Sequence, residues 1–382
     1  MEEIIRNNNL KITYFFQNSR KVKSEIDSTF AHEMFYGYFY FHNLYKDVEI
    51  VEFKKKHKTM FGNLFFRIIE KNLRQALKLP LYWSYLISKS TLNKILSSDL
   101  LIFSTNRVGC SAVPMILISK FLRRKNQSIS FILGLFSRSP KYKLFIPFQS
   151  LYIILFLKCM DKLIFLSQGE YEYACKRYKK YSKKFFLLPF AVDRKIWNLN
   201  SEHNQKKGVL FVGNDGFRNF DMVLKIEKKL KSLSFTIVST QIKKSEINNP
   251  KTNLINGSWS NQKLTDLELK KLYQKASVTI IPLLESLQPS GQSVALQSIA
   301  CGTPVIITRT DGFWDKVNFK DEKNIFFIEN DTLDNWCEII NKVLNLDNKD
   351  YQEVISSGVE LIKSKYDLQL FNKSLERIIV DK

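Results

Sequence analysis

The sequence has few of the side chains that bind metals or form disulfides. Its 382 residues include four histidines and five cysteines, and neither type clusters with the spacing of a metal site. It also lacks an Asp-x-Asp pair. Scattered cysteines in an odd number suit a reducing compartment, where each thiol behaves as a small apolar side chain. We therefore expect no metal ion, no bound cofactor and no disulfide framework.

Long hydrophobic runs are also missing. The longest, residues 144–157, contains Pro147 and Gln149 and falls short of the roughly 20 residues that cross a bilayer. The first ten residues include acidic side chains and lack the apolar core of a secretory signal. These features predict a cytoplasmic protein and leave open a peripheral position at the inner face of the plasma membrane.

Acidic residues are scarce in the first half of the chain. The whole sequence carries 59 Lys and Arg against 37 Asp and Glu, a net charge of +22. Residues 1–190 account for +19 of this charge, and residues 191–382 for +3. Such an excess favours an anionic neighbour, which could be a membrane surface, a phosphorylated lipid or a nucleic acid. A general bias toward lysine would explain the same numbers without any partner.

The first half alternates short apolar runs with helical patterns, which predicts a parallel sheet covered by helices. One helix is expected over residues 113–122. The expected strands are residues 11–16, 48–53, 99–104, 129–133, 162–167 and 185–188.

The second half repeats this rhythm, so we expect an α/β chain with two Rossmann-like βαβ domains that face an interdomain cleft. Its strands are expected over residues 208–212, 234–239, 278–281 and 304–308. Its helices are expected over residues 221–230, 266–275, 293–300 and from residue 333 onward. The predicted divisions are a basic acceptor domain (1–190), a nucleotide domain (191–365) and a C-terminal helix packing back toward the first domain (366–382).

Residues 54–96 combine aromatic side chains with lysine and arginine. An amphipathic surface that lies on a bilayer would have this composition. Helices that pack on the first sheet and expose basic faces to water would have it too. The sequence favours neither interpretation over the other.

Residues 288–307 (QPSGQSVALQSIACGTPVII) read as a loop, a helix and a strand. Ser290 and Gly291 open the helix, and a glycine there lets backbone N–H groups approach a ligand closely. A helix N-terminus favours phosphate groups. Gln297 lies four residues after Ser293, on the same face of the helix, where it could reach a ribose hydroxyl. Each piece alone could be an ordinary cap or turn, but together they indicate a nucleotide site.

This string resembles the retaining GT-B glycosyltransferases of family four, the glycosyl transferases group one. Their pattern is a Pro-ended strand, a Gly-rich turn, a helix bearing Glu, and small residues before Gly-x-Pro-Val-Ile. Three further segments carry the resemblance: residues 188–197 (LPFAVDRKIW), 209–218 (VLFVGNDGFR) and 272–282 (LYQKASVTIIP). Residues 254–259 are a fainter match. The resemblance covers residues 160–380, and the N-terminal half matches in its rhythm alone.

The sequence departs from this family at its acidic positions. Where relatives often carry two glutamates, this chain has Pro289 and Gln297, as in a Ser-Gly-Gln branch of the family. A glutamine still hydrogen-bonds hydroxyl groups but lacks the charge. Arg218 is then the best cation for a diphosphate, because a guanidinium matches phosphate oxygens. Lys225 or Arg309 could assist it.

The resemblance implies which residues bind the donor and which act in catalysis. The expected donor-binding residues are Gly213, Asn214, Arg218, Ser290, Gly291, Gln292, Ser293 and Gln297. The resemblance makes Gln297 and Arg218 the expected catalytic residues. Many relatives also place a histidine in the first domain, but the corresponding residues 105–109 (TNRVG) have none. His32 is a third candidate because its segment, FAHEMFYG, could line the acceptor side, although a lone histidine is more often structural. In a retaining mechanism the departing diphosphate can take the acceptor proton, so the enzyme mainly stabilises charge on the leaving group.

We therefore expect a metal-independent hexosyl- or related glycosyltransferase that uses a UDP- or GDP-sugar. Its acceptor would be a glycan or lipid-linked glycan in bacterial surface polysaccharide synthesis, such as that of lipopolysaccharide. An inactive homologue that serves as a nucleotide- or glycan-binding scaffold is the alternative. A nucleic-acid binder would also explain the charge, but the sequence lacks the aromatic RNA motifs and zinc spacings of that class.

Overall fold

The chain forms two compact units. The computed structural model describes residues 10–17, 20–25, 30–53, 64–199, 206–257 and 264–380. The first unit comprises Met1–Asp27, Phe35–Leu188 and Ser374–Lys382, and the second comprises Ser28–Met34 and Pro189–Lys373. A short segment near the N-terminus thus belongs to the second unit, although the residues on both sides of it belong to the first.

The first unit is built on a six-stranded parallel sheet with the strand order β2-β1-β3-β4-β5-β6. β3 and β5 are buried along their whole length, which explains why residues 100–103 and 163–165 read as continuous apolar runs in the sequence. The strands are β1 (Lys11–Gln17), β2 (Asp47–Phe53), β3 (Leu100–Phe103), β4 (Gln127–Ile132), β5 (Lys162–Phe165) and β6 (Phe185–Leu187).

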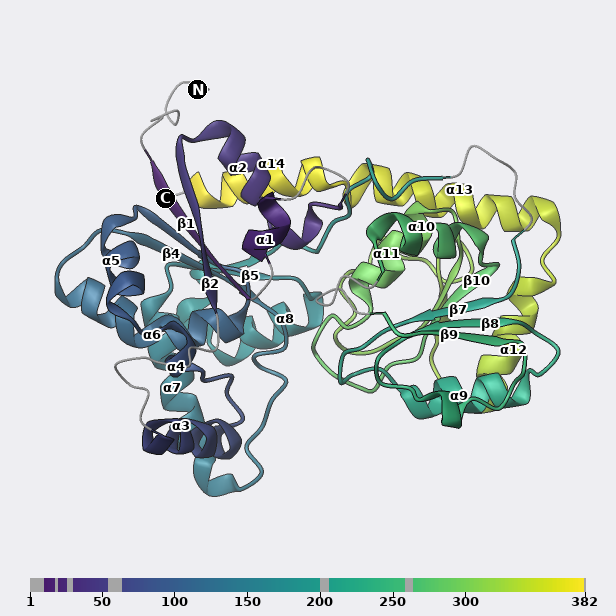
Figure 1. Ribbon diagram of the computed structural model, residues 1–382, viewed down its shortest axis with the longest axis horizontal. Coiled ribbons are helices and arrows are strands. Elements are labelled where there is room, and N and C mark those ends of the chain that lie inside the picture. Colours follow the sequence, from purple (N-terminus) through teal and green to yellow (C-terminus); the bar gives the residue numbers. More distant parts are fainter. Residues whose placement is uncertain are drawn as a thin grey trace. The chain divides into compact units, whose positions relative to one another are not determined.

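The helices of this unit lie on both faces of the sheet, as Figure 1 shows. The α-helices are α1 (Arg20–Glu25), α2 (Tyr38–Leu44), α3 (Leu64–Leu77), α4 (Trp83–Leu86), α5 (Lys89–Ser97), α6 (Asn106–Phe121), α7 (Ile146–Cys159) and α8 (Gln168–Arg177). Short 3-10 helices of this unit are η2 (Lys143–Phe145) and η3 (Lys179–Lys184), whereas η1 (Glu33–Phe35) begins in the second unit and ends in the first. α14 (Leu368–Val380) ends in residues of the first unit.

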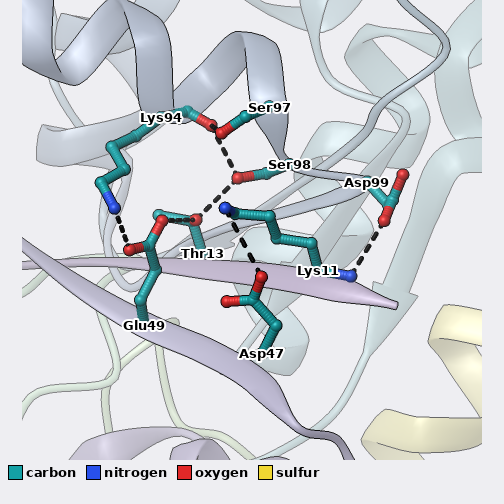
Figure 2. A network of polar contacts seen from close by, with 8 residues as sticks. All are labelled: Lys11, Thr13, Asp47, Glu49, Lys94, Ser97, Ser98 and Asp99. Atoms are coloured by element: carbon teal, nitrogen blue, oxygen red, sulfur yellow. Dashed lines mark hydrogen bonds and ion pairs between the residues drawn. The ribbon is translucent and has the colours of Figure 1, made fainter. Parts of the chain in front are cut away.

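Polar contacts join the first three strands near their amino ends (Figure 2). Thr13 is buried in β1, and its hydroxyl donates to Glu49 on β2 (3.1 Å) and lies 2.7 Å from the Ser98 hydroxyl. The Lys11 N–H donates to Asp99 (2.9 Å), which precedes β3. Ligands of parallel sheets bind at the opposite, carboxyl ends of the strands, so we assign this network to the fold.

The second unit contains another six-stranded parallel sheet, with the order β12-β11-β10-β7-β8-β9. Figure 1 shows α9 and α12 on one face of it and α10, α11 and α13 on the other. The strands are β7 (Val209–Val212), β8 (Phe235–Val238), β9 (Thr252–Ile255), β10 (Val278–Ile281), β11 (Val305–Thr308) and β12 (Phe326–Ile328). The helices are α9 (Phe220–Lys229), η4 (Lys244–Glu246), α10 (Asp266–Lys275), α11 (Gln292–Ala300), α12 (Leu333–Leu344) and α13 (Asn348–Lys365).

The expected strands are all present, but the helix predicted over residues 113–122 is wrong at its start. α6 begins at Asn106, because the Thr105 hydroxyl accepts the N–H of Val108 and caps the helix there. Its first turns contain the buried residues Gly109 and Ser111, so they show no amphipathic pattern. β12, with three residues, was not predicted.

Residues 144–157, the longest apolar run of the sequence, form part of η2 and most of α7. α7 has 14 residues, and within the described ranges the structure contains no helix with both the length and the apolar character that a membrane span requires. The described residues also contain no group of three or more His, Cys, Asp or Glu side chains that could hold a metal ion.

Candidate functional site

Two loops at the carboxyl ends of neighbouring strands meet in the second unit. One follows β7 and runs from Gly213 to Arg218, and the other follows β10 and leads to Gly291 at the start of α11. The backbone joins them, because the N–H of Asn219 donates to the carbonyl of Pro282 (2.9 Å). Since β7 and β10 pair in parallel, both loops lie at the sheet edge where α/β proteins bind ligands.

Arg218 is buried between these loops, with 4% of its surface exposed. Its guanidinium is packed against two glycines: a Cβ on Gly213 would lie 2.5 Å from Nε, and one on Gly291 would lie 2.8 Å from Nη1. Nε forms an ion pair with Asp215 at 3.3 Å, but neither Nε nor Nη1 has a hydrogen-bond partner. Burial lowers the pKa of Arg218, although an arginine remains charged at neutral pH. A buried charge with unused donors is costly unless a ligand completes it.

The start of α11 offers further unused polar groups beside Arg218. Gly291 is the N-cap with φ of 81°, a conformation that glycine adopts without strain, and no side chain caps the helix. The Ser290 hydroxyl is buried and has no hydrogen-bond partner. The helix N-terminus, a buried hydroxyl and a guanidinium together form a cradle that suits an anion such as a diphosphate.

Gln297 lies on the buried side of α11, 6% exposed. Its Nε2 donates to Glu33 Oε1 at 3.0 Å, and its Oε1 accepts from the Tyr273 hydroxyl at 3.3 Å. The carboxamide is therefore held in one orientation. A carboxamide has a second N–H and a second acceptor position, so one of each remains after these two bonds.

Glu33 is a residue of this site that the sequence did not single out. Its carboxylate is 2% exposed and also accepts from Trp197 Nε1 (2.7 Å) and from the N–H of Asp193 (3.3 Å). Burial raises the pKa of Glu33 to about 7, against the lowering effect of the Gln297 and Trp197 hydrogen bonds. The segment Ser28–Met34 thus brings a carboxyl group beside the position where the related family carries its second glutamate.

His32 precedes Glu33 and is half-buried in the same segment. Its backbone N–H donates to Asp193 at 3.3 Å, and its ring packs on Phe30. Burial lowers the pKa of His32, with a smaller contribution from Lys195 and an opposing one from Asp193. His32 therefore lies next to Glu33, the residue that holds Gln297. The lowered pKa favours the neutral form of His32 at pH 7.

The other expected donor-binding residues lie in the same two loops. The Asn214 side chain accepts from the N–H of Thr240 (2.6 Å) and donates to the Gly257 carbonyl (2.9 Å). It therefore joins the loop after β7 to the segments that follow β8 and β9. Gln292 is buried and Ser293 is partly buried in the first turn of α11. The structure brings the whole expected set to one edge of the sheet, with Asn214 fixed by contacts within the protein.

Lys225 and Arg309, the two auxiliary cations, are engaged elsewhere. Lys225 pairs with Asp221 at 2.6 Å on the exposed side of α9. Arg309 pairs with Glu329 at 2.8 Å and lies over the Phe327 ring. Arg218 is therefore the cation that the two loops enclose.

Replacing Gly291 with alanine is expected to disrupt this cradle. The new Cβ would lie 2.7 Å from Ile281 and 2.8 Å from Arg218 Nη1, at a positive φ that alanine disfavours. We expect a loss of about 1–3 kcal/mol in stability and weaker binding of nucleoside diphosphates. Gly216→Ala is the control in the neighbouring loop, because a Cβ there meets nothing within 4 Å. Thermal unfolding and calorimetric titration would measure both effects, and equal losses in the two variants would contradict the placement.

Part of the chain matches a known protein family. Residues 206–346 match the family described as Glycosyl transferases group 1. No curated protein matches the chain by sequence. The matched segment includes both loops of the site, from β7 to the start of α11 and beyond.

Several solved structures are similar over nearly the whole chain. A glycosyltransferase from Rickettsia africae ESF-5 superposes with a TM-score of 0.64 at 13% identity, covering 98% of this chain and 100% of that one. Alr3699/HepE from Anabaena, in complex with UDP and glucose, gives 0.65 at 10% identity and covers 98% and 100%. Sucrose-phosphate synthase from Thermosynechococcus elongatus gives 0.65 at 13% identity and covers 97% and 98%.

These similarities, with the two parallel sheets and their covering helices, confirm the α/β fold expected from the sequence. The chain has the fold of the GT-B glycosyltransferases, and its residues 206–346 match the glycosyl transferases group 1 family.

Proposed function

We propose that the protein transfers a sugar from a nucleoside diphosphate sugar to a hydroxyl group of an acceptor. The observation that carries this proposal is Arg218, buried with unused donors between two glycine-containing loops at the start of α11. In the proposal its guanidinium and the Ser290 hydroxyl bind the diphosphate at the N-terminus of α11. Gln297 offers its remaining N–H and acceptor position to the ribose.

The reaction follows from what this cradle stabilises. The bond between the anomeric carbon and the diphosphate oxygen breaks, and the nucleoside diphosphate leaves with its electron pair. Arg218 lowers the energy of the charge that develops there. The acceptor oxygen forms the new glycosidic bond, and its proton passes to the departing phosphate. We propose transfer with retention, in which the acceptor oxygen attacks from the face that the diphosphate leaves, and the neutral His32 is a second candidate acceptor for the proton.

For the donor we propose a UDP- or GDP-hexose, used without a metal ion. UDP is the nucleotide in the Anabaena complexes, which share this fold. For the acceptor we propose a glycan or lipid-linked glycan of a bacterial surface polysaccharide, such as lipopolysaccharide, met at the cytoplasmic face of the membrane. The charge of +19 on residues 1–190 supports an anionic acceptor or surface.

Calorimetric titration with UDP-, GDP- and ADP-sugars tests the proposal. We expect one base to bind at least about tenfold more tightly than the others, and the corresponding nucleoside diphosphate to be released when a glycan acceptor is present. Failure of every nucleoside diphosphate to bind would overturn the proposal.

A scaffold without turnover is the alternative function, and Pro289 and Gln297 are the observations that favour it. Such a protein would bind the donor but release no nucleoside diphosphate with any acceptor. The same titrations, followed by a release assay over a panel of acceptors, separate the two functions.

A further inference from the structure

The first unit contains an apolar groove between α3, α4 and α7 that the proposed chemistry does not use. Figure 1 shows these helices grouped beneath the first sheet, and α3 contacts both of the others. The groove has a volume of about 580 Å³, and all of its lining residues are apolar or aromatic. The lining residues include Leu73, Trp83, Phe148 and Leu151. We call this feature the apolar groove.

The rim of the apolar groove exposes large hydrophobic side chains to solvent. Leu144, Phe148 and Leu151 are 75%, 57% and 66% exposed. They are spaced at i, i+4 and i+7, so they follow one side of η2 and α7. Ile68 and Leu73 on α3 are also exposed, at 47% and 37%. Monomeric proteins in water seldom leave an apolar patch of this kind uncovered, so the surface is suited to an apolar partner.

The chain segments that frame the groove, residues 64–86 and 138–159, carry many cations and a single acidic residue, Glu70. The sequence contains no Asp or Glu between Asp99 and Asp161. Glu70, the acidic residue of α3, is 3% exposed and accepts from the N–H and hydroxyl of Ser84. The cations on these segments are Arg67, Lys71, Arg74, Lys78, Arg138, Lys141, Lys143 and Lys158. The partner must therefore be anionic around an apolar interior.

We propose that the apolar groove binds the surface of an anionic phospholipid bilayer and holds one lipid acyl chain. Leu144, Phe148 and Leu151 enter the region of the acyl chains, while Lys141 and Lys143 meet lipid phosphates. This combination of apolar insertion and charge is how surface-bound helices attach to membranes. A duplex nucleic acid supplies anions but no apolar interior, so it leaves the groove uncovered. This inference rests on the proposed function for its biological setting, because a lipid-linked acceptor would be reached from this surface.

The structure also settles how residues 64–96 of the ambiguous basic and aromatic segment are used. α3 and α4 pack beside α7, and Leu77 and Leu86 belong to the core of the first unit. Ile68, Ile69 and Leu73 nonetheless remain on the outside of α3. The helices therefore pack on the unit and expose an apolar side as well as a basic one. Residues 54–63 lie outside the described residues.

Vesicle sedimentation tests the surface. We expect the protein to sediment with vesicles that contain phosphatidylglycerol and phosphatidylcholine, and to stay in solution with phosphatidylcholine alone. Leu151→Glu should weaken binding to the anionic vesicles by about tenfold. Val317→Glu in the second unit is the matched control, because Val317 is 63% exposed, and it should bind as the unmodified protein does. Equal sedimentation of both variants, or equal binding to neutral vesicles, would overturn the proposal.

The charges are tested separately from the apolar rim. Replacing Lys141 and Lys143 together by glutamate should also reduce binding to anionic vesicles by about tenfold or more and lower its sensitivity to salt. The control pair is Lys349→Glu with Lys363→Glu on α13. Equally tight binding of the unmodified protein to duplex DNA would overturn the membrane assignment in favour of a general anion surface.

Trp83 reports whether an acyl chain enters the groove. Its indole lines the groove and donates to the Tyr152 hydroxyl at 3.2 Å. Lipids with brominated acyl chains quench a tryptophan that they touch, so such vesicles should quench part of the fluorescence. Trp83→Phe should remove that part, and unchanged quenching in this variant would show that the chain does not enter.

A measurement of nucleoside diphosphate binding distinguishes the membrane proposal from the proposed sugar transfer. All of these variants should bind the nucleotide as the unmodified protein does, which also shows that they are folded. Loss of vesicle binding with intact nucleotide binding supports the groove. Failure of the unmodified protein to bind any nucleotide would remove the proposed function and leave the vesicle result to stand on its own.

Discussion

Arg218→Ala is expected to weaken the binding of a nucleoside diphosphate by about 100-fold and that of the bare nucleoside by less than about threefold. A charge-assisted hydrogen bond contributes about 1.5–3 kcal/mol, and Arg218 has two nitrogens without a hydrogen-bond partner. The nucleoside lacks the diphosphate, so its affinity should change little. Calorimetric titration of the donor nucleotide, the diphosphate and the nucleoside measures this difference.

The alanine variant also leaves a space between Gly213 and Gly291, so a second variant is needed. Arg218→Lys keeps the charge but not the planar fork, and it should bind the diphosphate between the two extremes. Arg309→Ala is the matched control, because Arg309 also lies near the carboxyl end of a strand of this sheet but pairs with Glu329. Equal losses for diphosphate and nucleoside in Arg218→Ala would mean that the diphosphate binds elsewhere.

Much of the fold could be predicted because the two sheets are parallel and covered on both faces. β3 is wholly buried, so its sequence is an uninterrupted apolar run, and β10, also wholly buried, is apolar except for Thr279. The loop residues Gly213, Arg218 and Gly291 could be found for a different reason. Each is the residue type that a phosphate cradle requires, at the end of a recognisable strand or the start of a helix.

No comparable signal in the sequence points to Glu33. This residue and Gln297 are 264 positions apart, and no periodic pattern connects them. Glu33 lies in a 3-10 helix of three residues, in a segment that packs with the second unit although its neighbours in the chain do not. The apolar groove was hidden in the same way, because it depends on how α3, α4 and α7 pack rather than on any one of them.

Glu33 bears on the replacement of the family's second glutamate by Gln297. The related family carries a glutamate there, and this chain carries Gln297. A carboxyl group is nevertheless present 3.0 Å from the glutamine amide, supplied by Glu33. Since Trp197 and Asp193 donate to the same carboxyl group, it also fixes the chain segment that enters the second unit. We infer that Glu33 is a positioning residue, which orients Gln297 for the donor.

Glu33→Gln is therefore expected to remove a pH dependence from the stability of the second unit. Burial raises the pKa of Glu33 from 4.5 to about 7, so the folded state holds this proton more tightly than the unfolded state. Its contribution to stability is complete below about pH 4.5 and is lost as the pH rises through about 7. The loss is on the order of 3 kcal/mol. The variant should be less stable than the unmodified protein at pH 5, and this gap should close by pH 8.

Glu170 provides a matched control for this prediction. It is also buried, its pKa is also raised to about 7, and it accepts the N–H groups of Gly134 and Phe136 in the first unit. Both Glu33→Gln and Glu170→Gln should change the dependence of urea unfolding on pH between about 5 and 8. Donor affinity separates them, because loss of the Glu33 carboxyl group frees Gln297 and should weaken donor binding by about tenfold. Equal donor affinities in the two variants would make Glu33 a structural residue alone.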